Sequence, residues 1–85
     1  MILKKGLSEM IKIKLQVHGH LYWYAGKKYV LEVETEPQDM ETILEQAGIP
    51  TGEVSFVAID NKKLGLEHIP NDGDVIDVYP VVGGG

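Results

Sequence analysis

Alternation of apolar and polar residues predicts two strands near the start of the chain. Residues 10–17 (MIKIKLQV) have the period of two that is typical of a strand with one buried face. The side chains expected on that face are Ile11, Ile13, Leu15 and Val17. Residues 28–34 (KYVLEVE) repeat the pattern, so we expect this segment to pair antiparallel with the first strand. Residues 18–27 between them contain two glycines and are too many for a tight hairpin turn.

A helix is predicted next, because the spacing of apolar residues changes to that of a helix face. The residues on this face are Met40, Ile43, Leu44 and Ala47. Pro37 suits the first helical position, and the acidic residues just after it suit the positive end of the helix dipole. Gly48 supplies a stop signal, and Pro50 follows it.

The second half of the chain predicts two further strands and the overall fold. In order, the segments are a central strand at 54–60, a turn at 61–63, a bridge with one turn of helix at 64–70, a turn at 71–74 and a last strand at 75–80. Pro80 stands where strand pairing can end. The order of elements predicts an α+β fold of β-grasp type, in which a mixed sheet wraps over one main helix.

Length and hydropathy set the organisation of the chain. Its 85 residues are enough for one domain with a modest core. We expect an N-terminal extension at 1–9, the β-grasp domain at 10–80 and a flexible C-terminal tail at 81–85. No apolar run is long enough to span a bilayer, and residues 1–5 are too short for the core of a signal peptide. These features predict a cytoplasmic protein with no membrane partner.

Composition excludes several kinds of chemistry. The chain has no cysteine, which rules out disulfides, thiolate zinc sites, iron–sulfur clusters and a cysteine nucleophile. It has no arginine and a net charge of −5, so nucleic acid is not an expected partner. The acidic charge suits a basic protein surface, although it equally suits a solvated face that keeps the protein soluble.

The histidines and the aromatic run allow two interpretations each. His18 and His20, with His68 as a third ligand, would make a poor zinc site, because two histidines at i and i+2 in a loop have no acid or cysteine near them in the sequence. We therefore expect solvent-facing histidines and no bound metal. The run at 22–24 (YWY) is either a docking patch, since Tyr and Trp are frequent in binding hot spots, or a cap in which one or two rings cover an end of the core.

The end of the sequence carries the most specific motif. Residues 72–82 (DGDVIDVYPVV) form a Gly-Asp turn, an apolar strand and a Pro-Val segment, and three glycines follow them. This arrangement resembles the C-terminus of the MoaD/ThiS family of ubiquitin-like sulfur-carrier proteins. The resemblance extends from Met10 onward and leaves residues 1–9 outside it. Residues 21–26 are similar to the short turn of molybdopterin-synthase small subunits, which favours that branch of the family.

The resemblance implies a carrier rather than an enzyme. A ubiquitin-activating-type enzyme would adenylate the Gly85 carboxylate with ATP and magnesium, and a sulfur donor would displace AMP to leave a thiocarboxylate. The large subunit of a molybdopterin synthase, or an equivalent acceptor enzyme, would then take the sulfur. The carrier itself would bind no cofactor. The exposed sheet face beside the tail would dock the activating enzyme, with Phe56, Tyr79 and Pro80 as candidate contacts.

The physical properties of the tail agree with that role. Glycine has no side chain, so the segment formed by Val81, Val82, Gly83, Gly84 and Gly85 can enter a narrow channel. Five extended residues span roughly 17 Å. A terminal carboxyl is ionised at neutral pH and is a poor acyl donor until it is activated. The third glycine leaves two possibilities, a longer stalk or removal of Gly85 before activation.

Other functions fit the same sequence. A carrier for thiamine-thiazole synthesis or another sulfur-transfer pathway needs the same tail, and so does a ubiquitin-like modifier that forms isopeptide bonds with lysines. A pure interaction domain with an idle tail is the third possibility. The sequence does not name the acceptor, the activating enzyme, the oligomeric state or the role of residues 1–9.

Overall fold

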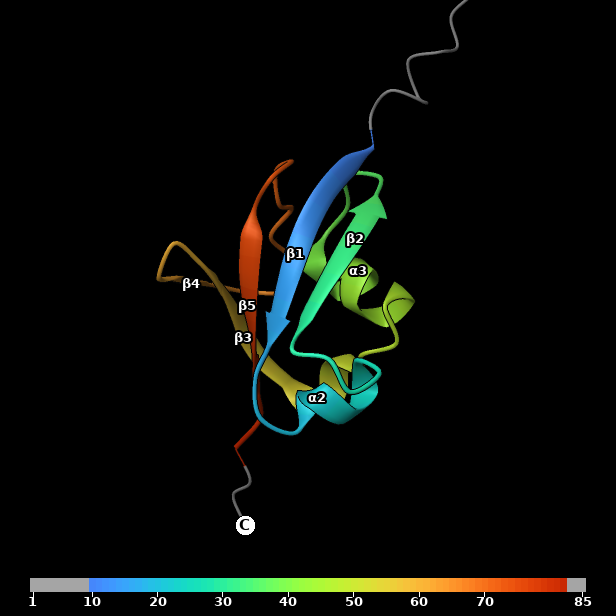
Figure 1. Ribbon diagram of the computed structural model, residues 1–85. Helices are drawn as coiled ribbons and strands as arrows, with labels where there is room; N and C mark the ends of the chain where they lie inside the picture. The colour runs from blue at the N-terminus through green and yellow to red at the C-terminus, as the bar shows by residue number, and fades with distance from the viewer. Residues whose placement is uncertain (1–9, 83–85) are drawn as a thin grey trace, which may run out of the picture.

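The computed structural model describes residues 10–82, which form a five-stranded mixed sheet with its main helix packed across one face (Figure 1). The strands are β1 (Ile11–Val17), β2 (Val30–Thr35), β3 (Val54–Ile59), β4 (Lys62–Leu64) and β5 (Val75–Pro80). The helices are α2 (Leu21–Tyr24), α3 (Met40–Gln46) and the 3₁₀ turn η1 (Thr51–Glu53). The strand order is β2-β1-β5-β3-β4. This arrangement confirms the predicted α+β fold of β-grasp type.

The two middle strands decide where the tail leaves the molecule. β1 and β5 are parallel, with Leu15 opposite Ile76, whereas every other pair of neighbouring strands is antiparallel. Parallel strands end at the same edge of a sheet, so the last residue of β5 lies near the last residue of β1. Figure 1 accordingly shows β5 ending at the end of the sheet opposite to the start of β1.

The core lies between α3 and one face of the sheet. Its fully buried residues include Leu15, Leu21, Met40, Ile43, Leu44, Ile49, Val57, Ile76 and Val78. Because side chains alternate along a strand, the same strands that fill the core also present polar side chains on the outer face. The predicted inner face of β1 and the predicted apolar face of α3 are both confirmed. Within residues 10–82, no helix has the length and apolar character that a membrane span requires.

The start of α3 differs from the prediction. Asp39, not Pro37, begins the helix, since the backbone N–H of Thr42 donates a 3.0 Å hydrogen bond to the Asp39 carboxylate. This is an N-cap, in which a side chain satisfies an amide that the first turn leaves unpaired. Hydrogen bonding from the Thr42 side chain and backbone lowers the pKa of Asp39 below its ordinary value of 3.8. The predicted stop at Gly48 is correct, and its φ of +86° suits glycine.

The segments around β3 and β4 also need correction. Residues 54–60 were expected to form the central strand, but β5 occupies the centre of the sheet and β3 lies beside it. Residues 61–63 are not a turn, because Lys62 already belongs to β4 and the turn consists of Asp60 and Asn61, both with positive φ. Residues 64–70 contain a turn but no helix. The two-residue turn was missed because the two lysines after Asn61 were assigned to the turn, whereas they begin the short strand β4.

Residues 18–27 contain helix α2, which attaches to the core through Leu21 and Ala25. Its aromatic residues point elsewhere: Trp23 is 64% exposed and Tyr24 is 42% exposed. Tyr22 is half-buried and packs against Tyr29, with ring centroids 4.4 Å apart. Of the two interpretations of residues 22–24, a cap on the core can therefore apply only to Tyr22, and the exposed Trp23 and Tyr24 fit the docking patch.

Candidate functional site

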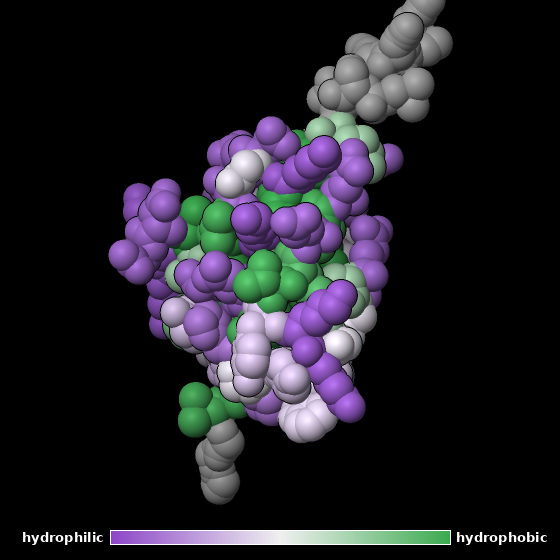
Figure 2. All heavy atoms as spheres, viewed as in Figure 1, coloured by the Kyte–Doolittle hydropathy of each residue, from purple (hydrophilic) through white to green (hydrophobic). Residues whose placement is uncertain are grey.

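The end of β5 is where the tail separates from the folded body. Pro80 is the last residue of the strand and lies opposite Val54 of β3. The backbone N–H of Val81 still donates a 2.9 Å hydrogen bond to the carbonyl of Glu53, whereas Val82 is 85% exposed. Figure 2 shows hydrophobic side chains projecting from the body at this point. The predicted working residues Gly83, Gly84 and Gly85 lie outside the described residues.

A row of stacked side chains lies on the outer face of the sheet beside the tail. We call this row the aromatic face, and its members are His18, Tyr79, Phe56 and Lys63. The rings of His18 and Tyr79 are stacked at 4.4 Å, and those of Tyr79 and Phe56 at 4.9 Å. The Lys63 ammonium lies 4.6 Å from the centre of the Phe56 ring, which is within cation–π range.

Strand alternation explains why these residues gather there. In β5, Ile76 and Val78 point into the core, so Asp77 and Tyr79 point outward. Tyr79 lies opposite Phe56 of β3, and His18 follows the end of β1. The Nε2 atom of His18 lies 3.0 Å from Oδ1 of Asp77, and this contact holds the imidazole against the Tyr79 ring.

A second histidine–carboxylate pair joins the loop after β1 to the end of η1. Nε2 of His20 is 2.9 Å from Oε1 of Glu53, and both side chains are close to half exposed. The sequence analysis assigned no acid to either histidine, and the fold corrects this because Glu53 and Asp77 are distant in the chain but adjacent in space. Among residues 10–82, no three His, Asp or Glu side chains come together in a way that could hold a metal ion.

The structure brings the three predicted docking residues together. Phe56 and Tyr79 are half-buried neighbours on the outer face rather than core residues, and Pro80 follows directly at the tail. Sequence reasoning missed His18 and Lys63 as members of the same row. A signal for His18 was its place one residue after a predicted strand, but the parallel pairing of β1 with β5, which brings it to Tyr79, was not predicted.

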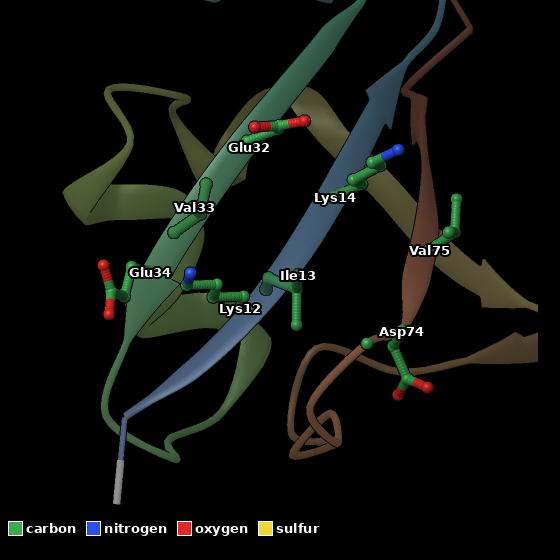
Figure 3. Close-up of a pocket in the computed structure, with 9 residues that line it drawn as sticks. Lys12, Ile13, Lys14, Glu32, Val33, Glu34, Asp74 and Val75 are labelled. Carbon is green, nitrogen blue, oxygen red and sulfur yellow. The ribbon is translucent and has the colours of Figure 1, made fainter. Parts of the chain in front are cut away.

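The opposite end of the outer face carries a shallow groove instead. It has a volume of about 570 Å³ and lies over β2, β1 and the start of β5. Lys12 and Lys14 of β1 stand opposite Glu34 and Glu32 of β2. Figure 3 shows the Lys12 ammonium reaching toward β2 and that of Lys14 toward β5. The groove therefore carries both lysine and glutamate side chains.

Comparison with known protein families identifies the family of this chain. The family model described as Mut7-C ubiquitin matches residues 12–83, which include the whole sheet except Ile11, together with the root of the tail. The chain belongs to the Mut7-C ubiquitin family. No curated protein matches it.

Several solved structures share the fold of this Mut7-C ubiquitin protein. A Pyrococcus furiosus protein described as a molybdopterin converting factor, subunit 1, has a TM-score of 0.65 at 21% identity, over 85% of this chain and 99% of that one. The small archaeal modifier protein 1 of Methanosarcina acetivorans has a TM-score of 0.66 at 20% identity, over 89% and 98%. The same modifier from Haloferax volcanii has a TM-score of 0.63 at 17% identity, over 87% and 99%.

These relationships confirm the resemblance to the MoaD/ThiS proteins. The Mut7-C ubiquitin chain is a small ubiquitin-like protein, and it shares its fold with proteins named as a molybdopterin converting factor subunit and as small archaeal modifiers. Identities of about a fifth show the shared fold. The pathway and the partners have to be argued from the site itself.

Proposed function

We propose that this protein is a sulfur carrier whose Gly85 carboxylate is the reactive group. The observation that carries the proposal is the position of the tail root. β5 delivers Val82 to an exposed point beside the aromatic face, and only glycines follow Val82 in the sequence. A carboxylate at the end of such a segment can enter the active site of another protein while the folded body stays outside.

The chemistry proceeds in two steps on the partner enzymes, adenylation of the carboxylate and then replacement of AMP by sulfur. A Gly85 carboxylate oxygen attacks the α-phosphorus of ATP, and the bond to pyrophosphate breaks to leave an acyl-adenylate. A donor at the oxidation level of sulfide then attacks the carbonyl carbon, and AMP leaves with the bonding electron pair. The product is a thiocarboxylate at Gly85. Magnesium and ATP belong to the activating enzyme, and this use of ATP fits the cytoplasmic location expected from the sequence.

The aromatic face is the proposed docking surface for the activating enzyme. Aromatic residues are enriched in the hot spots of protein interfaces, and this row is half-buried and already ordered by its own stacking. Preordered side chains lose little conformational freedom on binding. Phe56, Tyr79 and Pro80 therefore contact the partner while the tail beyond Val81 enters its active site.

Molybdopterin synthesis is the destination that we propose for the sulfur. The similarity of residues 21–26 to molybdopterin-synthase small subunits favours it, and the Pyrococcus furiosus structural relative carries a name from that pathway. The acceptor enzyme would be the large subunit of a molybdopterin synthase or an equivalent protein. A carrier for thiamine-thiazole or another sulfur-transfer pathway is the alternative within the same chemistry.

A protein modifier is the second candidate function, and the structural relatives named as small archaeal modifier proteins favour it. Modification uses the same adenylate, but a lysine amine of a target attacks the carbonyl carbon in place of sulfur. The two functions separate when the protein is incubated with cell extract and ATP. Peptides in which Gly85 is joined to a target lysine support the modifier, and their absence together with a thiocarboxylate supports the carrier.

Intact mass spectrometry of the protein isolated from its native cells tests the proposal directly. A carrier shows a fraction heavier by the replacement of one oxygen with sulfur, and this fraction disappears in cells that lack the activating enzyme. A species lighter by one glycine residue shows that Gly84 is the working terminus. A chain that continues past Gly85 in the cell, or one that never gains sulfur when its pathway is active, contradicts the proposal.

A further inference from the structure

We propose that three residues form a collar around the end of β5, and that this collar fixes both the direction of the tail and the point where it becomes free. The tail collar consists of Gly19, His20 and Glu53, and it surrounds Pro80 and Val81. Its geometry stands by itself, whereas its consequence for activation rests on the proposed function. Gly19 and Glu53 are accordingly positioning residues.

The first contact is the packing of Gly19 against Pro80. A Cβ atom at position 19 would lie 2.9 Å from Cγ of Pro80, a distance that real Cβ atoms essentially never show. Gly19 also has a φ of +60°, in the left-handed region that favours glycine. Any other residue here would have to push Pro80 away, so the close approach depends on glycine.

The second contact holds the tail from the opposite side. The Val81 N–H donates its 2.9 Å hydrogen bond to the carbonyl of Glu53, which ends η1 just before β3. On the side of β1, the His18 N–H donates to the carbonyl of Val78 at 3.1 Å and continues the parallel pairing as far as the collar. The end of β5 is thus held between the loop after β1 and the turn before β3.

The third contact joins the two sides to each other. His20 directly follows Gly19, and its Nε2 atom lies 2.9 Å from the Glu53 carboxylate. Gly19 touches Pro80, Val81 bonds to Glu53, and Glu53 pairs with His20, so the contacts close into a ring. A ring of contacts restrains the tail root in more directions than any one of them alone.

The collar shortens the segment that can reach into a partner. The span of roughly 17 Å expected from the sequence counted all five tail residues from Val81. Because the hydrogen bond to Glu53 holds Val81, the part of the tail that can extend into a partner begins at Val82. Four residues, 82–85, span roughly 13 Å when extended. A partner must therefore bring its active site within that distance of the collar. Tyr79 and Pro80 are adjacent in the chain, so docking on the aromatic face places the partner beside the collar.

Gly19→Ala tests the collar, and Gly26→Ala is its matched control. Both glycines have positive φ, but a Cβ at Gly26 would have no neighbour within 4 Å, so the control shares the backbone strain without the Pro80 contact. The measurement is amide hydrogen exchange and ¹⁵N relaxation of Val81 by NMR. Gly19→Ala is expected to speed exchange at Val81 roughly tenfold, equivalent to about 1.4 kcal/mol, and Gly26→Ala is expected to leave it unchanged. Equal exchange at Val81 in the wild type and in Gly19→Ala overturns the collar.

Kinetics of adenylation test its role in positioning. With a cognate activating enzyme, Gly19→Ala is expected to raise the KM for the carrier about tenfold with little change in kcat, since the activated carboxylate itself is unaltered. Glu53→Ala is expected to raise the KM less, and Glu53→Gln to restore it because the amide oxygen can still accept a hydrogen bond from His20. A KM in Gly19→Ala equal to that of Gly26→Ala overturns the positioning role. If even the wild type is not adenylated, the proposed function and this role fail together, while exchange at Val81 still decides the collar.

Discussion

Replacing Tyr79 by alanine removes the middle ring of the aromatic face and separates docking from stability. Tyr79 stacks on His18 at 4.4 Å and on Phe56 at 4.9 Å, so the substitution breaks two ring contacts. Aromatic pairs contribute about 0.5–1.5 kcal/mol each beyond the area they bury, which gives a loss of about 1–3 kcal/mol in the free energy of unfolding. A small domain with a stability of about 5–15 kcal/mol remains folded after that loss.

The effect on activation is expected in a variant that remains folded. If Tyr79 is a hot spot, its removal costs at least about 2 kcal/mol of binding, or roughly 30-fold in kcat/KM for adenylation. The assay is ATP–pyrophosphate exchange with the activating enzyme, with urea unfolding of the same samples in parallel. Tyr79→Phe keeps the ring and should stay close to the wild type. Val75→Ala, at the far end of the same strand and face, is the control for a change outside the aromatic face.

Two results would refute this reasoning. A folded Tyr79→Ala variant that is adenylated at the wild-type rate shows that the aromatic face does not dock the activating enzyme. A Tyr79→Phe variant that loses as much activity as Tyr79→Ala shows that the hydroxyl group, rather than the stacked ring, carries the effect. Loss of folding in Tyr79→Ala alone would mean that the row belongs to the stabilising core, contrary to its place on the outer face.

Three further outcomes are expected. Ile43→Ala should lower the free energy of unfolding by about 2–5 kcal/mol, because Ile43 is almost fully buried in the core; urea titration followed by the fluorescence of Trp23, the single tryptophan, measures this loss. Asp39→Ala should remove part of the acid dependence of stability, because the hydrogen bonds from Thr42 lower the pKa of Asp39 in the folded protein. The stabilisation by Asp39 is complete above its ordinary pKa of 3.8 and disappears as the pH falls through the lowered pKa. Urea midpoints that fall equally with pH in the wild type and in Asp39→Ala contradict this. Deletion of Gly84 and Gly85 should abolish adenylation and leave the urea midpoint unchanged, and a deletion variant that still supports its pathway in the cell refutes the carrier function.

The sequence predicted the elements whose signals are local. β1 and α3 were recognised from periods of two and 3.6 residues, and these periods persist because each element buries one face against the same core. The start of α3 was misplaced by three residues, at Pro37 instead of Met40, because proline and aspartate give overlapping start signals. β4 was missed because a strand of three residues at the edge of a sheet, two of them lysines, has no apolar alternation to detect.

The site was predicted only in part, because its members come together through long-range pairing. Phe56, Tyr79 and Pro80 were proposed because the resemblance to the sulfur carriers implies docking on the sheet face beside the tail, and the structure brings the three residues together. His18 could not be assigned to Tyr79 without the parallel register of β1 and β5, which no local pattern specifies. The collar could not be predicted either, because Gly19 and Pro80 are in contact but lie far apart in the sequence.

The division of one sheet into two faces explains how such a protein can change partners without losing its fold. Along β5, Ile76 and Val78 fill the core, while Asp77 and Tyr79 alternate with them on the outer face. A substitution at an outward position alters what a partner touches and leaves the buried residues intact. Proteins named as a converting factor and as modifiers share this fold with TM-scores of 0.65 and 0.66 at about a fifth of identical residues. The core therefore constrains the backbone path of β5 to the collar. Under the proposed function, the choice between sulfur transfer and modification is made by the outer face and by the enzyme that receives the tail.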